Sequence, residues 1–256
     1  MTTPIPRDIP DLPVVPGIPA LLPAPVPASA VVAPVRHPLT AVYRLLIALA
    51  AVTGVTIELF LGSPVRVLTF FAVQSNILLA LVCVSAARRA WSARRPLPSA
   101  LTGATLLYVM ITGSVYHLLL VDGTPPFTMT PTVHGPSGWA SLASQLLQTV
   151  TPVAAALDWL LLTPPARLRV RQASTWMLYP LIYLALTLTR GELILPGTSG
   201  RYLYPFLDID LHGYKSVLSN ALLLGLACYA LAVVLVAVDH ARPNTVHHRA
   251  KTGFRL

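Results

Sequence analysis

The segment from residue 139 to residue 163 constrains the fold of this chain more than any other. It reads WASLASQLLQTVTPVAAALDWLLLT, and it is long and apolar enough to cross a bilayer, since about 20 helical residues span the hydrocarbon. It also carries Gln145, Gln148, Pro152 and Asp158. Polar groups at membrane depth are costly unless they face protein or a cavity. We therefore expect this segment to lie inside a bundle, with the other spans around it.

The rest of the chain supplies those other spans. Of its 256 residues, 55% are hydrophobic and 11% are charged, which is typical of a membrane protein. Six segments are apolar enough to span, and they lie at residues 40–62, 66–87, 100–121, 139–163, 173–190 and 215–238. The sequence thus predicts an all-α, polytopic membrane protein, folded as a bundle of six transmembrane helices.

Two tails flank the predicted transmembrane domain, which covers residues 40–240. Residues 1–39 contain 11 of the 25 prolines, so we expect a proline-rich, disordered tail rather than a packed element. Residues 241–256 form a short basic tail, which suits a membrane surface with anionic lipid heads.

The positions of the basic residues predict the orientation. If both termini are cytoplasmic, 14 of the 18 lysines and arginines lie on the cytoplasmic side, as the positive-inside rule requires. The sequence therefore predicts a multi-pass protein of a cell membrane, and the many alanines, prolines and arginines suggest a bacterial gene. The net charge of +9 does not indicate nucleic acid as a partner, because the basic residues cluster at the ends of apolar segments.

Several polar residues of the expected spans share a similar depth. Those within about 10 Å of the outer ends are Glu58, Thr69, His117 and Gln145. Asn76 and Gln148 lie nearer the middle of their spans. A polar cavity that opens outward explains these positions, because polar groups avoid lipid tails. The loop at 191–214, rich in aromatic residues, is expected to cover that cavity or to anchor the protein at the interface.

Each of these polar residues also has a purely structural interpretation. Ser75, Asn76 and Asn220 are residue types that hydrogen-bond neighbouring helices together. His117 suits the membrane interface, and Glu58 suits a carboxylate that reaches toward it. No GxSxG, HExxH, phosphate-binding loop or CxxC pair is present, so we expect no metal and no cofactor.

Five sequence blocks resemble a known family of membrane proteins. They read VQSNILLAL (73–81), TGSVYHLLL (112–120), TPVAAALDWLLL (151–162), YPLIYLALTLTRG (179–191) and YLYPFLDIDLHGY (202–214). Over about residues 40–240, the chain resembles the bacterial "Pr-six-Pr" family, which is similar to the animal androgen-induced proteins. The resemblance implies a six-helix bundle and, from the animal members, a hydrolase of fatty-acid esters of hydroxy fatty acids. Those enzymes use a threonine nucleophile within the membrane and a histidine as its partner.

The residues of this chain depart from that catalytic pair. The position of the family histidine holds Gln148, which cannot take a proton near neutral pH. The position of the family threonine holds Ala72, unless the register shifts by three residues to Thr69. We therefore expect Thr69 as nucleophile and His117 as base. Ser75 and Thr149 are alternative nucleophiles, and Glu58 is an alternative base.

Three functions remain open at this point. The first is a membrane-embedded hydrolase of fatty-acid esters, with Asn76, Gln145, Gln148 and Glu58 as expected substrate-binding residues. The second is a non-catalytic protein that binds lipid or another amphiphile in the same cavity. The third is a transporter, which the sequence favours less because the polar residues gather in the outer half and no internal repeats are evident. The expected partners are membrane lipids, with a fatty-acid ester as substrate in the first case.

Overall fold

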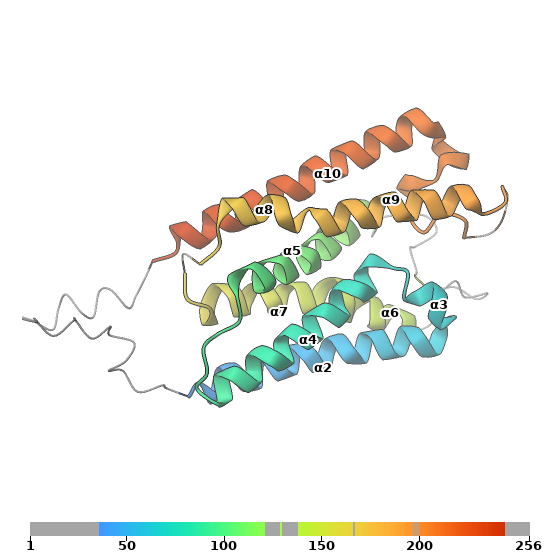
Figure 1. Ribbon diagram of the computed structural model, residues 1–256. Coiled ribbons are helices and arrows are strands. Elements are labelled where there is room, and N and C mark those ends of the chain that lie inside the picture. The colour runs from blue at the N-terminus through green and yellow to red at the C-terminus, as the bar shows by residue number, and fades with distance from the viewer. Residues whose placement is uncertain are drawn as a thin grey trace, which may run out of the picture. The chain divides into compact units, whose positions relative to one another are not determined.

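The structure, a computed structural model, describes residues 36–120, 129, 138–165, 167–196, 198 and 200–243. The described residues between 36 and 243 belong to one compact unit. Throughout the described part the regular structure is helical (Figure 1), which confirms the all-α class. The expected tails at 1–39 and 241–256 lie almost wholly outside the described residues.

Five helices in the described part are long and apolar enough to cross a membrane. They are α2 (Pro38–Leu61), α4 (Phe71–Trp91), α5 with η1 (Ser99–Leu120), the run from α6 to η3 (Gly138–Leu162), and α10 (Ile209–Ala241). This supports the membrane character that the composition predicts. Each of the five overlaps one of the expected spans, with ends that differ by up to six residues.

The remaining expected span, at 173–190, falls on two consecutive helices. These are α8 (Val170–Trp176) and α9 (Leu178–Leu193), which run nearly in line beside α10 (Figure 1). Met177 joins them with φ −68° and ψ −18°, close to helical values. Neither helix has the length of a span by itself, so the structure provides five spanning helices and a two-part sixth segment.

The second expected span begins with a break in its helix. Helix α3 (Pro64–Val67) ends four residues before α4 starts at Phe71, and the backbone of Phe70 is extended. Tyr183 of α9 holds this break: its hydroxyl accepts from the Phe71 N–H at 3.1 Å and donates to the Thr69 carbonyl at 2.8 Å. A residue more than 100 positions away in sequence thus fixes the start of α4.

Three π-helical turns interrupt the third and fourth spans. Turn η1 (Tyr116–Leu120) follows α5 (Ser99–Val115). Turn η2 (Leu146–Val150) joins α6 (Gly138–Gln145) to α7 (Thr151–Leu157), and η3 (Asp158–Leu162) ends that run. Pro152 cannot donate to the Gln148 carbonyl four residues earlier, which suits a π turn at that position. Turns of this kind often occur at functional sites.

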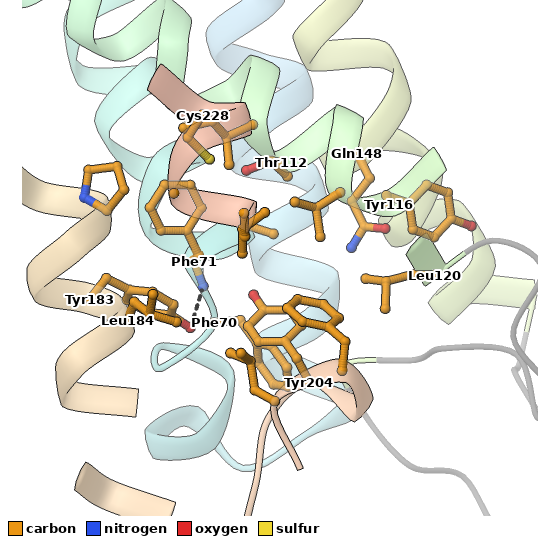
Figure 2. Close-up of a pocket in the computed structure, with 18 of the residues that line it drawn as sticks. Phe70, Phe71, Thr112, Tyr116, Leu120, Gln148, Tyr183, Leu184, Tyr204 and Cys228 are labelled. Atoms are coloured by element: carbon orange, nitrogen blue, oxygen red, sulfur yellow. Dashed lines mark hydrogen bonds between the residues drawn. The ribbon is translucent and has the colours of Figure 1, made fainter. Parts of the chain in front are cut away.

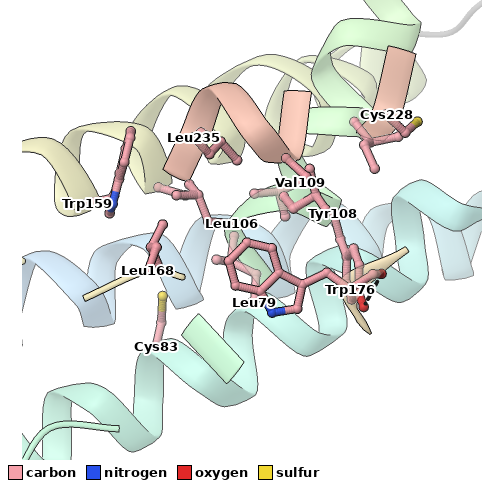
Figure 3. Close-up of a cluster of buried hydrophobic side chains, with 14 of the residues drawn as sticks. Leu79, Cys83, Leu106, Tyr108, Val109, Trp159, Leu168, Trp176, Cys228 and Leu235 are labelled. Atoms are coloured by element: carbon pink, nitrogen blue, oxygen red, sulfur yellow. Dashed lines mark hydrogen bonds between the residues drawn. The ribbon is translucent and has the colours of Figure 1, made fainter. Parts of the chain in front are cut away.

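The larger of two buried clusters of apolar side chains holds the bundle together (Figure 3). Trp176 of α8 packs into it at Gly103 of α5, where an added Cβ would lie only 2.4 Å from the Trp176 ring. The Trp176 indole donates to the Ala100 carbonyl at 2.8 Å, so the ring is both packed and hydrogen-bonded. Cys83 and Cys228 are free thiols in this same cluster, where they pack as small core residues.

Asp239 fixes the end of the bundle where α10 finishes. Its side chain is 1% exposed and accepts from the N–H groups of Arg167 and Leu168 at 2.7 and 2.8 Å. It also accepts from the Trp159 indole at 3.1 Å and from the Arg242 guanidinium. Because a buried carboxylate needs this many partners, Asp239 ties the linker before α8 to the end of α10.

Candidate functional site

An apolar pocket lies at the other end of the bundle, where α4 begins (Figure 2). We name it the central pocket, with a volume of about 70 Å³. Its wall comes from α4, α5, η1, η2, α9, α10 and the segment before α10. Aromatic rings contribute much of this wall, and they belong to Phe70, Phe71, Tyr116, Tyr183, Tyr204 and Phe206. The volume leaves room for several water-sized groups.

Gln148 supplies the amide group of this wall. Its side chain is 3% exposed, and its Oε1 accepts from the Ser144 hydroxyl at 3.2 Å. Figure 2 shows the amide directed into the pocket, with the nitrogen toward the space between Leu120 and Tyr204. In the part of the chain that the structure describes, no acceptor takes a hydrogen bond from Nε2. Gln148 therefore offers a donor inside an apolar space.

Asn76 does not line the pocket but locks one wall to another. It is fully buried, and its Nδ2 donates to the carbonyls of Ala72 at 2.8 Å and Leu147 at 3.0 Å. Its Oδ1 accepts from the Thr151 hydroxyl at 2.6 Å. These bonds join α4 to the fourth span at the residue next to Gln148. The structure thus gives Asn76 the interhelical role, one of its two interpretations from sequence.

Thr69, expected as nucleophile, lies in the break before α4. Its hydroxyl donates to the Arg66 carbonyl at 2.5 Å, and the residue is not part of the pocket wall. Because it precedes the helix, it does not share a helical face with Ala72 and Asn76. Ala72, at the position of the family threonine, does line the pocket together with Gln148.

His117, expected as base, lies in a different depression. It is exposed on η1, and its Nε2 is 3.0 Å from the Thr149 hydroxyl on η2. A side groove with a volume of about 430 Å³ is lined by both residues, by Ser114 and by Gln148. The structure therefore pairs His117 with Thr149, which the sequence offered only as an alternative nucleophile, and not with Thr69.

The two other expected binding residues lie outside both spaces. Gln145 is exposed on α6, while Glu58 is buried on α2 at 1% exposure. Neither lines the central pocket or the side groove. The structure thus brings Gln148 alone of the four expected binding residues into the pocket wall.

The segment before α10 closes the pocket from outside the helices. Tyr204 and Phe206 stack with ring centroids 5.4 Å apart, and Tyr204 meets Phe70 edge-on at 6.0 Å. Two residues of this wall, Tyr183 and Tyr204, were not among the site residues expected from the sequence. The signal for Tyr204 in the sequence was the aromatic content of the loop at 191–214. That content fits both a cover over the cavity and an anchor at the membrane interface, whereas the ring contacts of Tyr204 and Phe206 favour the cover.

Arg201 and Tyr202 fasten that closing segment to the end of α9. The Arg201 guanidinium donates to the Asp210 carboxylate at 2.6 Å and to the Gly191 carbonyl at 2.7 Å. The hydrogen bond to Asp210 raises the pKa of Arg201 further. Tyr202 donates to the Glu192 carboxylate at 2.8 Å; burial and this bond raise the pKa of Tyr202 to about 12.

Comparison with known proteins does not assign this chain to a family. The chain matched no protein-family model, no curated protein and no solved structure. Within the described residues, no three histidine, cysteine, aspartate or glutamate side chains gather as they would around a metal ion.

Proposed function

We propose that this chain is an integral membrane protein that binds the apolar chain of a membrane amphiphile in the central pocket. The observation that carries the proposal is the aromatic wall of that pocket, which comes from the start of α4, from η1 and from α9, and which Tyr204 and Phe206 close. Pockets for apolar ligands have this character, with few polar groups among apolar and aromatic side chains. A ligand of this kind reaches such a pocket directly from the bilayer.

The same proposal includes six spans, with both termini in the cytoplasm of a bacterial cell. Residues 170–193, which form α8 and α9, are about 36 Å long if the helix runs on through Met177, more than the hydrocarbon thickness. The 14 of 18 basic residues that then lie inside support this arrangement.

Cysteine labelling tests the orientation. In a background without Cys83 and Cys228, Thr198→Cys should react with an impermeant maleimide from outside, and Ser92→Cys only after permeabilisation. If α8 and α9 do not span, the loop at Thr198 stays on the inner side. Labelling of Thr198→Cys only after permeabilisation therefore contradicts six spans.

Photo-crosslinking tests the pocket. A fatty-acyl probe with a diazirine in its chain should modify residues of the central pocket in the purified protein. Gly225→Leu should suppress this modification, because Gly225 lines the pocket and an added Cβ meets nothing closer than 3.9 Å. The matched control is Gly138→Leu, where a Cβ meets nothing within 4 Å and the pocket is not touched. Equal modification of both variants contradicts the proposal.

A second candidate function, ester hydrolysis, is favoured by one specific contact. The His117 imidazole lies 3.0 Å from the Thr149 hydroxyl in the side groove, within the range in which a base activates a nucleophile. Thr69, whose hydroxyl binds a backbone carbonyl, has no such neighbour in the described structure. If this pair hydrolyses a fatty-acid ester, Thr149→Ala and His117→Ala should each abolish turnover, whereas Thr69→Ala should leave the turnover rate unchanged. Absence of turnover in the wild-type protein removes this candidate and leaves the first.

A further inference from the structure

We infer that the central pocket selects its amphiphile by an uncharged hydrogen-bond acceptor, a carbonyl of the ester or amide type, which Gln148 binds through Nε2. This inference rests on the proposed function, because it names the chemistry of the ligand that the pocket holds. An apolar chain alone gains little by leaving the bilayer for the pocket, since lipid tails are as apolar as the wall. Selection therefore depends on the polar contact.

The donor of Gln148 is the unused polar group of this wall. Its Oε1 is occupied by Ser144, whereas Nε2 has no acceptor among the described residues and faces the pocket. A donor that faces an apolar space without an acceptor gains a hydrogen bond when a ligand brings one, so such a ligand is stabilised there.

The other polar groups of the wall are already engaged or point elsewhere. The Thr112 hydroxyl donates to the Tyr108 carbonyl at 3.1 Å, and the Tyr183 hydroxyl donates to the Thr69 carbonyl at 2.8 Å. Tyr116 directs its hydroxyl away from the pocket in Figure 2. The Tyr204 hydroxyl is hydrogen-bonded to Tyr183, and the Cys228 thiol is only a weak donor. Among the described residues, the ligand's acceptor is therefore expected to bind Gln148.

The surroundings of Gln148 hold its backbone in place before a ligand arrives. Asn76 binds the carbonyl of the preceding residue, Leu147, at 3.0 Å. On the other side, Gly113 of α5 lies so close that an added Cβ would be 3.2 Å from the Gln148 carbonyl. A side chain on a backbone fixed in this way loses less freedom when it binds a ligand, which favours affinity.

The start of α4 favours an acceptor at the same place. Phe71 and Ala72, its first two residues, line the pocket. The Tyr183 hydroxyl takes the Phe71 N–H, and the N-cap residue of this helix, Phe70, provides no side-chain cap for the N–H groups that follow. The amino end of a helix carries partial positive charge, which attracts a carbonyl oxygen.

The charge of the wall decides between a carbonyl and an anion. None of the described residues that line the central pocket is a lysine, arginine or histidine. A carboxylate or phosphate would be buried there without a counter-ion, which is far more costly than burying a neutral carbonyl. The inferred ligand is therefore neutral at the end that Gln148 binds.

Competition against the acyl photo-probe tests this inference in the purified protein. The competitors share one chain length and differ at the end: an alkane, a methyl ester, an N-methyl amide and, at pH 8, a carboxylate. We expect the ester and the amide to displace the probe about 5- to 10-fold more strongly than the alkane, the gain from one net hydrogen bond. The carboxylate should displace the probe about 5- to 10-fold less strongly than the alkane, because its charge would be buried without a counter-ion.

Two variants then assign the effect to Gln148. Gln148→Leu should bring the ester and the alkane to equal potency, with little change for the alkane, because leucine fills the same space without the donor. Ser144→Ala is the matched control and should keep the ester preference, since it leaves Nε2 in place. The order of the four competitors is measured on the wild-type protein. It therefore tests the inference even if one of the variants does not fold.

The outcomes separate this inference from the proposed function. Equal displacement by alkane and ester, stronger displacement by the carboxylate, or an ester preference that survives Gln148→Leu overturns the inference and leaves apolar-chain binding intact. No saturable displacement by any competitor overturns both.

Discussion

The two ends of the bundle treat their buried polar groups in opposite ways. At the end where α10 finishes, the Asp239 carboxylate is surrounded by donors from Trp159, Arg167, Leu168 and Arg242. At the end where α4 begins, Gln148 keeps a donor that no described residue uses, and it directs this donor into an apolar pocket.

This difference separates a structural end from a binding end. A polar network satisfied within the chain stabilises one arrangement of the helices, and it leaves nothing for a ligand. The broken start of α4 and the two π turns around the central pocket have the opposite effect, because they free backbone and side-chain groups from the regular helical pattern.

The largest expected effect comes from the structural end. Asp239→Asn should lower the free energy of unfolding by about 3–5 kcal/mol, because it leaves the Arg242 guanidinium buried without its counter-charge. Unfolding in mixed micelles with increasing SDS measures this loss.

A matched aspartate checks that the effect belongs to the network. Asp208 caps α10 by accepting from the N–H groups of Asp210 and Leu211, and asparagine caps a helix about as well. Asp208→Asn should therefore change stability little. A similar small loss for Asp239→Asn would mean that the two ends do not differ as described.

A smaller effect is expected from the lock beside the pocket. Asn76→Ala removes the hydrogen bonds to Leu147 and Thr151 and should cost about 1–2 kcal/mol, the range for hydrogen bonds between membrane helices. It should also weaken the ester preference of the pocket, because Gln148 follows Leu147. Asn220→Ala is the control: it removes one half-buried bond to the Phe206 carbonyl, and it should cost about 0.5 kcal/mol. Equal losses from the two variants would contradict the role of Asn76 as a lock.

The sequence predicts the structural end better than the binding end. Apolar segments locate the five spanning helices to within a few residues, because each needs a long apolar run and little else. Asp158, a polar residue of the fourth span, has a partner inside the bundle as well, because it pairs with Arg44 of α2.

The binding end depends on contacts that no local pattern reveals. Thr69 lies outside the helix that carries Ala72 and Asn76, because Tyr183, far along the chain, stabilises a break in the helix at that point. His117 meets Thr149 because both lie on π turns, where one extra residue per turn displaces the faces expected from a period of 3.6. Gln148 lies in the wall of the central pocket, and the local signal for it is that a buried amide in an apolar run needs a partner or a space.

The pair of Arg44 and Asp158 sharpens the comparison at the structural end. Their atoms are 2.9 Å apart, and their side chains are 14% and 17% exposed. A double-mutant cycle with Arg44→Met and Asp158→Asn should give a coupling energy of roughly 0.5–1 kcal/mol, because partial exposure lets water screen the charges. A coupling as large as the Asp239 effect would show that this second ion pair belongs to the same network.

The smallest effect concerns the closing segment of the binding end and appears only at high pH. Burial and the hydrogen bond to Glu192 raise the pKa of Tyr202 to about 12, whereas an unfolded tyrosine ionises near pH 10. Below pH 10 both states keep the proton, and the contribution of Tyr202 is fully present. Between pH 10 and about 12 the unfolded chain loses this proton first, so stability falls as the pH rises. Tyr202→Phe keeps the ring that packs on Gly191 but cannot ionise, so its stability should fall less steeply across this window. Equal slopes for the two proteins, measured by thermal unfolding from pH 9 to pH 12, would show that Tyr202 is not held as the structure describes.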